Sequence, residues 1–271
     1  MNPIITASLT GPAATSAQSP AMPRNPEEIA AAGKAAYEAG AAVLHIHLRD
    51  NDQFSTDLNV ARKTVQLCRE ACPGIVQLST GGSMDYDERV KIIEARPAMA
   101  TLNPATMTVG DDEFRNPPKK MYKLAERMLE LGIKPEVECY DTGHVALMLD
   151  LLKKGLLTEP LQVSFILGMK GGAAPDPLLL RYMVGELPEG TSWQVIAIGK
   201  ANLPMTTIGL AMGGNARTGL EDTLMIRPKV LAESNAQLVE ALVNVARAMH
   251  KEPATVSEVV ERLKLNPELL G

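Results

Sequence analysis

The sequence predicts a (βα)8 TIM barrel, an α/β fold, with extra helices at its C-terminal end. Short apolar runs alternate with longer helical patterns along the whole chain, which is typical of βα units around a parallel sheet. Eight such runs are present, and a chain of 271 residues fits one barrel of roughly 250 residues. A doubly wound sheet is the alternative, but it needs fewer strands or a reversal of the strand order. We therefore expect one catalytic barrel domain over residues 1–271.

The strands are expected at short apolar runs bounded by turn residues. In chain order they are Ile4–Leu9, Ala42–His47, Ile75–Ser79, Ala98–Leu102, Lys134–Glu138, Gln162–Leu167, Ser192–Ile198 and a weak last strand near Asn215.

Helices are expected between the strands, because Pro stands near several of their starts and Gly follows several of their ends. They are Pro26–Ala39, Asn59–Ala71, Pro118–Leu131, Gly143–Lys154 and Pro177–Gly185. After the eighth unit, Asn235–Lys251 and Thr255–Leu265 are predicted as helices that close or extend the barrel. The loop Gly11–Asn25 is long for a βα connection, and long loops there are usually functional.

The composition is that of an ordinary globular protein. Hydrophobic residues make up 45% and charged residues 22%, which excludes disordered, collagen-like and disulfide-stapled chains. A net charge of −5 without a basic block argues against nucleic acid and acidic membranes as partners. Three cysteines without zinc-type spacing predict free thiols in a reducing compartment, the cytoplasm. No run of ~18 apolar residues and no signal-like start is present, so we expect neither a membrane anchor nor export.

Polar residues follow every predicted strand, where the carboxyl ends of barrel strands form the active site. In strand order these segments are Thr10-Gly11, His45–Asp50, Ser79–Gly82, Thr101–Asn103, Glu136–Glu138, Gly168–Gly172, Gly199-Lys200 and Arg217–Asp222. Eight polar strand ends out of eight predict an active site at this face of the barrel.

His45 and His47 are the sharpest feature of this face. The period of two in a strand points both imidazoles to the same side, with Ile46 on the other. Two histidines on one inward face suit a divalent metal, although a hydrogen-bonded pair of core histidines is the alternative. A catalytic zinc site needs a third ligand, and Glu221 or Asp222 can supply it because strand eight lies two places from strand two.

The other polar strand ends have less specific roles. Arg217 is placed to bind a substrate carboxylate or to tune an acid, whereas Arg49 and Asp50 are expected to be structural. Ser79-Thr80-Gly81-Gly82 offers hydroxyls and backbone N–H groups at a helix start, which suits an anion. The turn Gly168–Gly172 either lets a phosphate or pantetheine chain approach the backbone or is simply a turn. No catalytic role is expected for the remaining histidines, His144 and His250.

Together these motifs make the chain resemble the β-keto acid cleavage enzymes over nearly all of its length. The resemblance rests on Leu9-Thr10-Gly11, His45–Asp50, Gln77–Gly82, Ala100–Asn103, Gly110–Asp112, Pro135–Glu138, Gly213–Asp222 and Ala232–Val239.

The resemblance implies a zinc-dependent (βα)8 enzyme, usually a homo-oligomer and in particular a tetramer. Such an enzyme converts a β-keto acid and acetyl-CoA into acetoacetate and a new acyl-CoA. By motif, the resemblance implies that the Zn2+ ligands are His45, His47 and Glu221. It implies contacts to the keto acid from Thr10, Ser79, Thr101 and Asn103. Proton transfer and charge stabilisation would be carried out by Glu138, Arg217 and Asp222, with Asp222 as the base. Gly171, Gly172 and Lys200 are expected to contact the coenzyme.

Two departures from the family pattern bear on the substrate. Members that act on an aminated keto acid carry an acidic residue in the loop after Thr10-Gly11, whereas Ala13 and Ala14 stand here. A cationic substrate would lose its partner, so we expect a neutral distal end. The family often has an arginine and an aromatic residue where Lys200–Pro204 lies, but Lys200 still offers a point charge to a phosphate.

Two alternative functions stay open on the sequence. One is a metal-dependent lyase or aldolase that acts on a keto acid without coenzyme A. The other is a catalytically silent barrel that binds a small acid, which the presence of His45, His47 and Glu221 disfavours.

Overall fold

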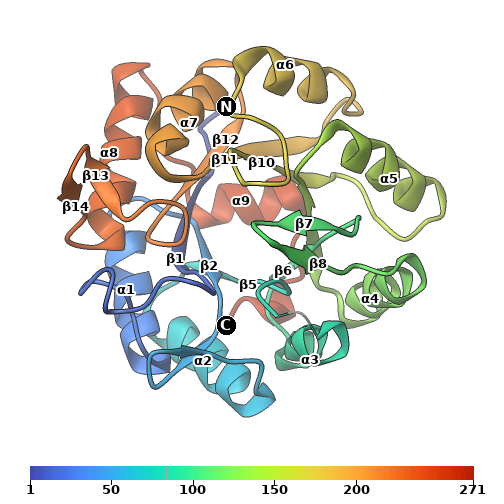
Figure 1. Ribbon diagram of the computed structural model, residues 1–271, viewed down its shortest axis with the longest axis horizontal. Helices are drawn as coiled ribbons and strands as arrows, with labels where there is room; N and C mark the ends of the chain where they lie inside the picture. The colour runs from blue at the N-terminus through green and yellow to red at the C-terminus, as the bar shows by residue number, and fades with distance from the viewer. Residues whose placement is uncertain (84) are drawn as a thin grey trace.

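The computed structural model describes residues 1–83 and 85–271, and its centre is a closed barrel of eight parallel strands (Figure 1). Around the barrel the order is β1-β12-β11-β10-β9-β6-β5-β2. The strands are β1 (Ile5–Thr10), β2 (Val43–Ile46), β5 (Ile75–Leu78), β6 (Met99–Leu102), β9 (Lys134–Cys139), β10 (Gln162–Leu167), β11 (Ser192–Ala197) and β12 (Asn215–Thr218). All eight predicted strands and the predicted TIM barrel are therefore confirmed.

Helices α1 to α8 surround the barrel (Figure 1). They are α1 (Pro26–Glu38), α2 (Leu58–Ala71), α3 (Tyr86–Val90), α4 (Pro118–Leu131), α5 (Thr142–Lys153), α6 (Pro177–Gly185), α7 (Asn202–Ala211) and α8 (Asn235–Ala248). Their starts follow local chemistry, since side chains such as Asn25 before α1 and Ser234 before α8 accept hydrogen bonds from the first turn. The predicted helices agree within a few residues at each end.

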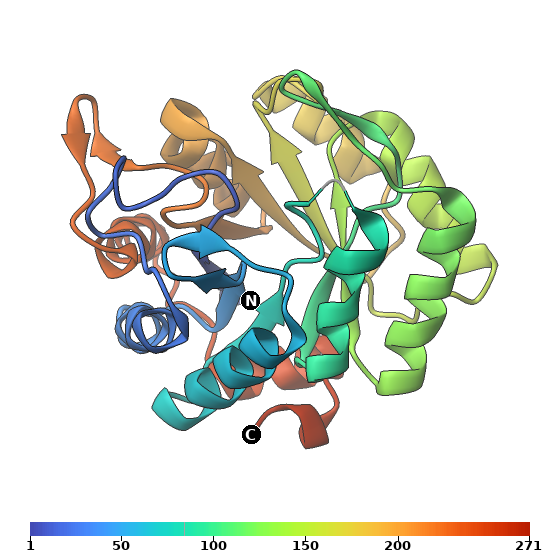
Figure 2. The ribbon, with the colours of Figure 1, turned by 60° about the horizontal axis from the view of Figure 1, so that its bottom comes forward.

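The ninth α-helix, α9 (Val256–Leu263), closes the amino-terminal end of the barrel, as Figure 2 shows. Thr255 and Glu258 form a reciprocal capping box at its start. Its Val259 and Leu263 are fully buried in the same apolar cluster as Ile4 at the first strand. Of the two predicted C-terminal helices, α9 therefore closes the barrel, whereas α8 packs against α1 and β1 on its side.

Several short elements were not expected from the sequence. They are α3, α7, the turns η1 (Lys91–Ala95), η2 (Gly199–Ala201) and η3 (Pro267–Leu269), and the hairpins β3–β4 (Arg49–Asp50, Gln53–Phe54), β7–β8 (Met107–Val109, Asp112–Phe114) and β13–β14 (Met225–Arg227, Val230–Leu231). The helix start predicted at Ser79–Gly82 is corrected, because α3 begins only at Tyr86 with Asp85 as its cap. Residues 79–83 form a loop instead.

The inside of the barrel is polar, whereas the apolar core lies between strands and helices. In β1, Ile5 and Ala7 belong to an outer apolar cluster. Thr6 and Ser8 are buried with polar partners, Gln194 on β11 and Asp222 in the turn after β12. The period of two in a strand produces this division. A polar interior lets one face of every strand supply chemistry at the carboxyl end.

Candidate active site

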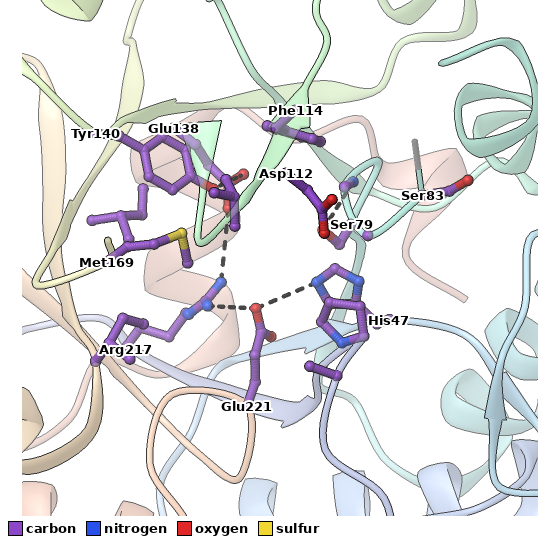
Figure 3. A pocket seen from close by; sticks show the side chains of 17 residues that line it. His47, Ser79, Ser83, Asp112, Phe114, Glu138, Tyr140, Met169, Arg217 and Glu221 are labelled. Carbon is purple, nitrogen blue, oxygen red and sulfur yellow. Dashed lines mark hydrogen bonds and ion pairs between the residues drawn. The ribbon is translucent and has the colours of Figure 1, made fainter. Parts of the chain in front are cut away.

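A cavity of about 430 Å³ opens at the carboxyl ends of the strands. Figure 3 shows the side chains around it, which come from the barrel strands, from the loops that follow them and from the hairpin β7–β8. Its lining includes His47, Ser79, Glu138, Arg217 and Glu221. The cavity therefore lies at the strand ends, where the sequence predicted an active site.

Among the described residues, no helix is long and apolar enough to span a membrane.

His45, His47 and Glu221 converge at one side of this cavity. Their nearest nitrogen and oxygen atoms all lie within 4.8 Å of one another. The Nε2 atom of His45 is 3.1 Å from Glu221 Oε2, and the Nε2 atom of His47 is 3.3 Å from Glu221 Oε1. Of the two carboxylates that the sequence left open as third donor, the structure brings Glu221 to the histidines.

The donor set fits a divalent cation. His45 Nδ1 lies 2.7 Å from the Gln77 side-chain oxygen and donates to it, so His45 Nε2 carries a lone pair when the ring is neutral. That lone pair faces an oxygen of Glu221, and neither atom has a hydrogen-bond partner in the described part of the chain. A cation between two nitrogens and a carboxylate oxygen would remove this repulsion and match the ligand set of a catalytic zinc site.

Charge in the triad follows from its neighbours. Burial opposes the ionisation of Glu221, but Arg217 and both histidines hold its pKa well below the usual range. Burial lowers the pKa of His47 despite the nearby carboxylate. Against burial and the charge of Arg217, Glu221 raises the pKa of His45. The triad therefore holds an ionised carboxylate and, at His47, a neutral imidazole, and a bound metal ion would displace any proton from His45 Nε2.

Arg217 is held by two carboxylates, those of Asp222 and Glu221. Its Nη2 donates to Asp222 Oδ1 at 2.6 Å and to Glu221 Oε1 at 2.9 Å, and its Nε donates to Asp222 Oδ2 at 3.1 Å. Ser8 adds a hydrogen bond of 2.7 Å to Asp222 Oδ2. Arg217 Nη1 has no hydrogen-bond partner among the described residues and lies 3.9 Å from Glu138 Oε1 across the cavity (Figure 3).

Asp222 itself is not among the described residues that line the cavity, and both of its oxygens are engaged. The role of Asp222 as the base stays a prediction. The bidentate pair with Arg217 uses the carboxylate to orient the guanidinium, so Asp222 acts one contact away from the cavity.

Glu138 is the fully buried carboxylate that does line the cavity. Burial raises its pKa to about 7, against the opposing charges of His45 and Arg217. The Tyr140 hydroxyl donates to Glu138 Oε2 at 3.4 Å, and burial raises the pKa of this phenol well above its usual range. A carboxyl group with a pKa near 7 exchanges protons readily at neutral pH.

The predicted keto acid contacts divide into two groups. Ser79 lines the cavity, whereas the Thr10 hydroxyl donates to the His47 carbonyl oxygen at 2.6 Å and the Thr101 hydroxyl accepts from the Thr80 N–H at 2.9 Å. Thr10 and Thr101 are not on the described cavity lining, and their hydrogen bonds hold strand-end loops, so their contact with the keto acid stays a prediction. Asn103 is 3% exposed, and neither atom of its amide has a hydrogen-bond partner in the described chain.

The expected coenzyme contacts lie beside the cavity. Gly171 packs so closely against the hairpin β7–β8 that a Cβ there would lie 2.2 Å from the Thr108 carbonyl oxygen. The Gly172 N–H donates to the Met169 carbonyl oxygen within the same turn. Lys200 is exposed at the start of the segment that leads into α7. Packing and the turn therefore explain why glycine stands at positions 171 and 172. The contact of both residues with the coenzyme stays a prediction.

Other predictions concern structural residues. Arg49 donates to the carbonyl oxygens of Gly11 and Ala14, which fixes the long loop after β1, as a structural role requires. His144 accepts a hydrogen bond from the Tyr140 N–H near the cavity wall. Asp50 and His250 are exposed.

Sequence reasoning missed most of the apolar lining. Phe114 and Val109 come from the hairpin β7–β8, Met169 follows β10, and Tyr140 follows β9. Asp112 also lines the cavity, from the same hairpin. The position of Tyr140 two residues after Glu138 was the one usable signal, since both point inward from the end of β9.

Known proteins resemble the chain along almost its whole length. The profile of the beta-keto acid cleavage enzyme family matches residues 3–265. A 3-keto-5-aminohexanoate cleavage enzyme from Fusobacterium nucleatum is 36% identical over 267 residues, with 97% of each chain covered. A 3-oxoadipate:acetyl-CoA acetyltransferase from Cupriavidus necator is 31% identical, with 94% of this chain and 92% of the relative covered.

A third relative, a 3-dehydrocarnitine:acetyl-CoA trimethylamine transferase from Rhizobium meliloti, is 31% identical over 96% of each chain. Among solved structures, ObcA in complex with oxaloacetate superposes with a TM-score of 0.81 at 18% identity. That match covers 92% of this chain and 68% of the other, and it shows the likeness of the fold.

Proposed function

Because the chain belongs to the β-keto acid cleavage enzyme family, we propose that it exchanges a β-keto acid with acetyl-CoA, giving acetoacetate and a new acyl-CoA, at a zinc site. The convergence of His45, His47 and Glu221 beside Arg217 and Glu138 is the observation that carries the proposal. Relatives named as acetyl-CoA transferases support the thioester as second reactant.

Zinc on the three donors would act as a Lewis acid toward the keto oxygen of the substrate and stabilise negative charge there. Among the ions that bind two imidazoles and one carboxylate with an open position, zinc suits the donors better than magnesium or calcium. Elemental analysis of protein purified without chelator tests this choice.

The side chains divide the remaining work. Arg217 Nη1 lacks a hydrogen-bond partner among the described residues, so it can hold the carboxylate of the keto acid from the cavity wall. Glu138 faces Arg217 and is placed to take the proton from the carbon between the keto and carboxyl groups. The resulting carbon nucleophile attacks the acetyl carbonyl, and the coenzyme A thiolate leaves.

The same groups serve the second half of the exchange, in which the new acyl-CoA forms. The thiolate attacks the original keto carbon, and the carbon–carbon bond to the acetoacetate fragment breaks. Glu138 returns its proton to that fragment, so atoms and charge balance. The Ser79 hydroxyl lies on the cavity and can donate to the oxygen that becomes negative in each addition. Asp222 keeps Arg217 oriented throughout.

The distal end of the substrate is proposed to be neutral. Pro12 and Ala13 line the cavity without a charge, and Val109, Ile166 and Ile198 add apolar surface. Asp112 is the carboxylate of the hairpin wall, and it is exposed. An exposed carboxylate binds a cation less strongly than a desolvated one because water screens it.

The predicted coenzyme contacts and assembly are part of the proposal. Exposed Lys200 can meet a coenzyme phosphate, and the turn at Gly171 and Gly172 can border the pantetheine chain. Exposed apolar side chains on α6 and on β13–β14 support a homo-oligomer of barrel domains spanning residues 1–271: Leu178, Tyr182, Met225, Val230 and Leu231. Three buried free thiols support a reducing compartment such as the cytoplasm. Light scattering tests the assembly.

The test of function is a screen of β-keto acids that follows acetoacetate release with and without acetyl-CoA. We expect release that depends on the thioester and is coupled to formation of the acyl-CoA of the tested acid. Cleavage without any thioester would identify a lyase or aldolase instead. Binding of the acids without turnover, by metal-loaded protein, would identify a silent binding barrel.

A further inference from the structure

A second buried carboxylate, Glu136, lies inside the barrel away from the described cavity lining. Three side-chain amides from three other strands converge on one of its oxygens. The Nε2 atoms of Gln77, Gln194 and Gln162 donate to Glu136 Oε2 at 2.9, 3.0 and 3.4 Å. These four side chains are at most 3% exposed, so water does not substitute for the contacts.

The carboxylate determines how the amides are oriented. An ionised carboxylate only accepts hydrogen bonds, so each glutamine must turn its NH2 group toward Glu136. The arrangement of Gln194 agrees independently, because its oxygen accepts from the Thr6 hydroxyl at 3.0 Å. For Gln77 the consequence is that its oxygen points to His45 Nδ1, at 2.7 Å.

An amide oxygen at that place accepts a hydrogen bond and therefore requires a proton on His45 Nδ1. In the neutral ring, the other nitrogen, Nε2, then keeps its lone pair, and it is this atom that faces Glu221 in the metal site. We infer that Glu136 is a positioning residue, which through Gln77 fixes His45 in the tautomer that binds the metal ion. This inference rests on the zinc site proposed above.

The charge of Glu136, rather than its shape, is what the inference requires. An amide at position 136 both donates and accepts, so Gln77 could turn over and present its NH2 group to His45. His45 Nδ1 would then accept, the proton would move to Nε2, and the lone pair would be lost to the metal. Contacts with metal ligands of this kind typically change metal affinity ~10- to 100-fold.

The first experiment measures the affinity of the full chain for Zn2+ by competition with a chelating indicator. Glu136→Gln should weaken binding by about 10- to 100-fold, with a cooperative thermal transition showing that the chain is folded. Gln162→Met is the matched control, because it removes another donor from Glu136 but leaves the path to His45 intact. Equal affinity losses in the two variants, or no loss in folded Glu136→Gln, would overturn the inference.

Exchanging the carboxylate and the amide between positions 136 and 77 should restore zinc affinity. In the double variant Glu136→Gln, Gln77→Glu, the new carboxylate accepts from the amide at 136 and from His45 Nδ1, so the proton returns to Nδ1. Zinc affinity should recover to within a few-fold of wild type, and a double variant as weak as Glu136→Gln would contradict the inference.

The tautomer itself is measurable without metal. Long-range 1H–15N correlation spectra of the metal-free wild-type chain at alkaline pH should show His45 protonated at Nδ1, and Glu136→Gln should shift the population toward Nε2. A wild-type ring protonated at Nε2 overturns the inference even if zinc binds. If wild type fails to bind zinc but shows the Nδ1 proton, the proposed metal site fails and the tautomer control stands.

Discussion

The two walls of the cavity are built in different ways. The wall that carries the metal donors and Arg217 consists of β1, β2, β12 and the residues just after them, and hydrogen bonds hold several of its side chains, such as those that join Asp222 to Arg217 and Ser8. Gly11 lies so close to Glu221 that a Cβ there would be 2.9 Å from the Glu221 Cγ, and the Glu221 N–H donates to the Ser8 carbonyl oxygen. The backbone at Gly11 and Ser8 therefore fixes the position of Glu221 in this wall.

The opposite wall is apolar and comes mainly from loops. Phe114 and Val109 belong to the hairpin β7–β8, and Met169 belongs to the turn after β10. The hairpin and the turn are joined by the hydrogen bond from the Gly110 N–H to the Lys170 carbonyl oxygen and by an exposed ion pair between Lys170 and Asp111. Exposed ion pairs contribute little to stability.

The contrast teaches where chemistry and specificity reside in this barrel. Under the proposed function, the groups that carry the chemistry stand on or next to strands, and the surface proposed to meet the variable end of the substrate stands on loops, which tolerate change. Substitutions in the first wall should therefore affect turnover, and substitutions around the second should affect the choice of substrate.

The largest effect is expected from removing metal donors. His45→Ala together with His47→Ala leaves Glu221 as the single donor of the triad, so the protein should lose stoichiometric zinc. Loss of several kcal/mol of charge stabilisation lowers turnover by ~10³-fold or more. Metal content by elemental analysis is the measurement, and His250→Asn, at an exposed histidine, is the control. A double alanine variant that keeps its metal would show that the ligands lie elsewhere.

The next effect concerns Arg217, Asp222 and Glu138. Arg217→Ala, Asp222→Asn and Glu138→Gln should each lower kcat by ~10²-fold or more while zinc content stays near wild type. Asp222 acts through Arg217, so the double variant of these two should be no slower than the slower single variant. Multiplicative losses would show that Asp222 works independently, for example as the base. Loss of metal in any single variant would move that residue into the ligand shell.

A third effect is the pH dependence that Glu138 imposes. Burial raises its pKa to about 7, and the proposed base works only when ionised. The value of kcat/KM should therefore rise about tenfold per pH unit below about 7 and level off above it. The profile of residual activity in Glu138→Gln should lack this limb. A wild-type profile that is flat between pH 5.5 and 7.5 would remove Glu138 from the role of base.

The same group affects stability in the opposite direction. The folded chain holds the Glu138 proton up to about pH 7, whereas the unfolded chain releases it near the usual pKa of about 4.5. Between these values the folded state binds more protons, so the free energy of unfolding falls as pH rises, by on the order of 3 kcal/mol. Denaturant titrations of the metal-free chain at pH 5 and 7.5 should show this loss in wild type but not in Glu138→Gln.

The first wall was more predictable from sequence than the second for a physical reason. Strand periodicity places His45 and His47 on one face, and the closed order of βα units brings Glu221 next to them. Which carboxylate after β12 reaches the histidines was open, because residues 219–222 form a turn without periodicity. The direction of a hydroxyl is not encoded in a pattern either, and so the hydrogen bonds of Thr10 and Thr101 to neighbouring loops could not be predicted.

The second wall gave almost no sequence signal. Strands of two or three residues, such as β7 and β8, are too short to show alternation, so Phe114 and Val109 could not be placed. The helix α7 was missed because its run Asn202–Ala211 is apolar with Pro and Gly inside, and it lacks a side-chain cap. Loop conformation depends on tertiary contacts such as that of Gly171 with Thr108, which no local pattern reveals.

The smallest effect is a change of substrate preference at Ala13, which stands on the loop after β1 and not on a strand. This residue lines the cavity near the start of the loop after β1, where it offers a methyl group. Ala13→Glu should raise kcat/KM for an amine-bearing β-keto acid about tenfold, since a charged hydrogen bond in a partly exposed site contributes ~1.5 kcal/mol. Ala13→Gln, of the same size without the charge, should leave the ratio of aminated to neutral substrate near that of wild type.

The comparison also decides the role of Asp112. Wild type should prefer the neutral keto acid, because the exposed Asp112 carboxylate on the hairpin is screened by water and partners a distal cation weakly. If wild type already prefers the aminated acid and Asp112→Asn abolishes that preference, the counter-charge comes from the hairpin and the proposed neutral substrate is wrong. If Asp112→Asn leaves a neutral preference unchanged while Ala13→Glu reverses it, the loop after β1 sets specificity. The strand-built wall would then serve many β-keto acids unchanged.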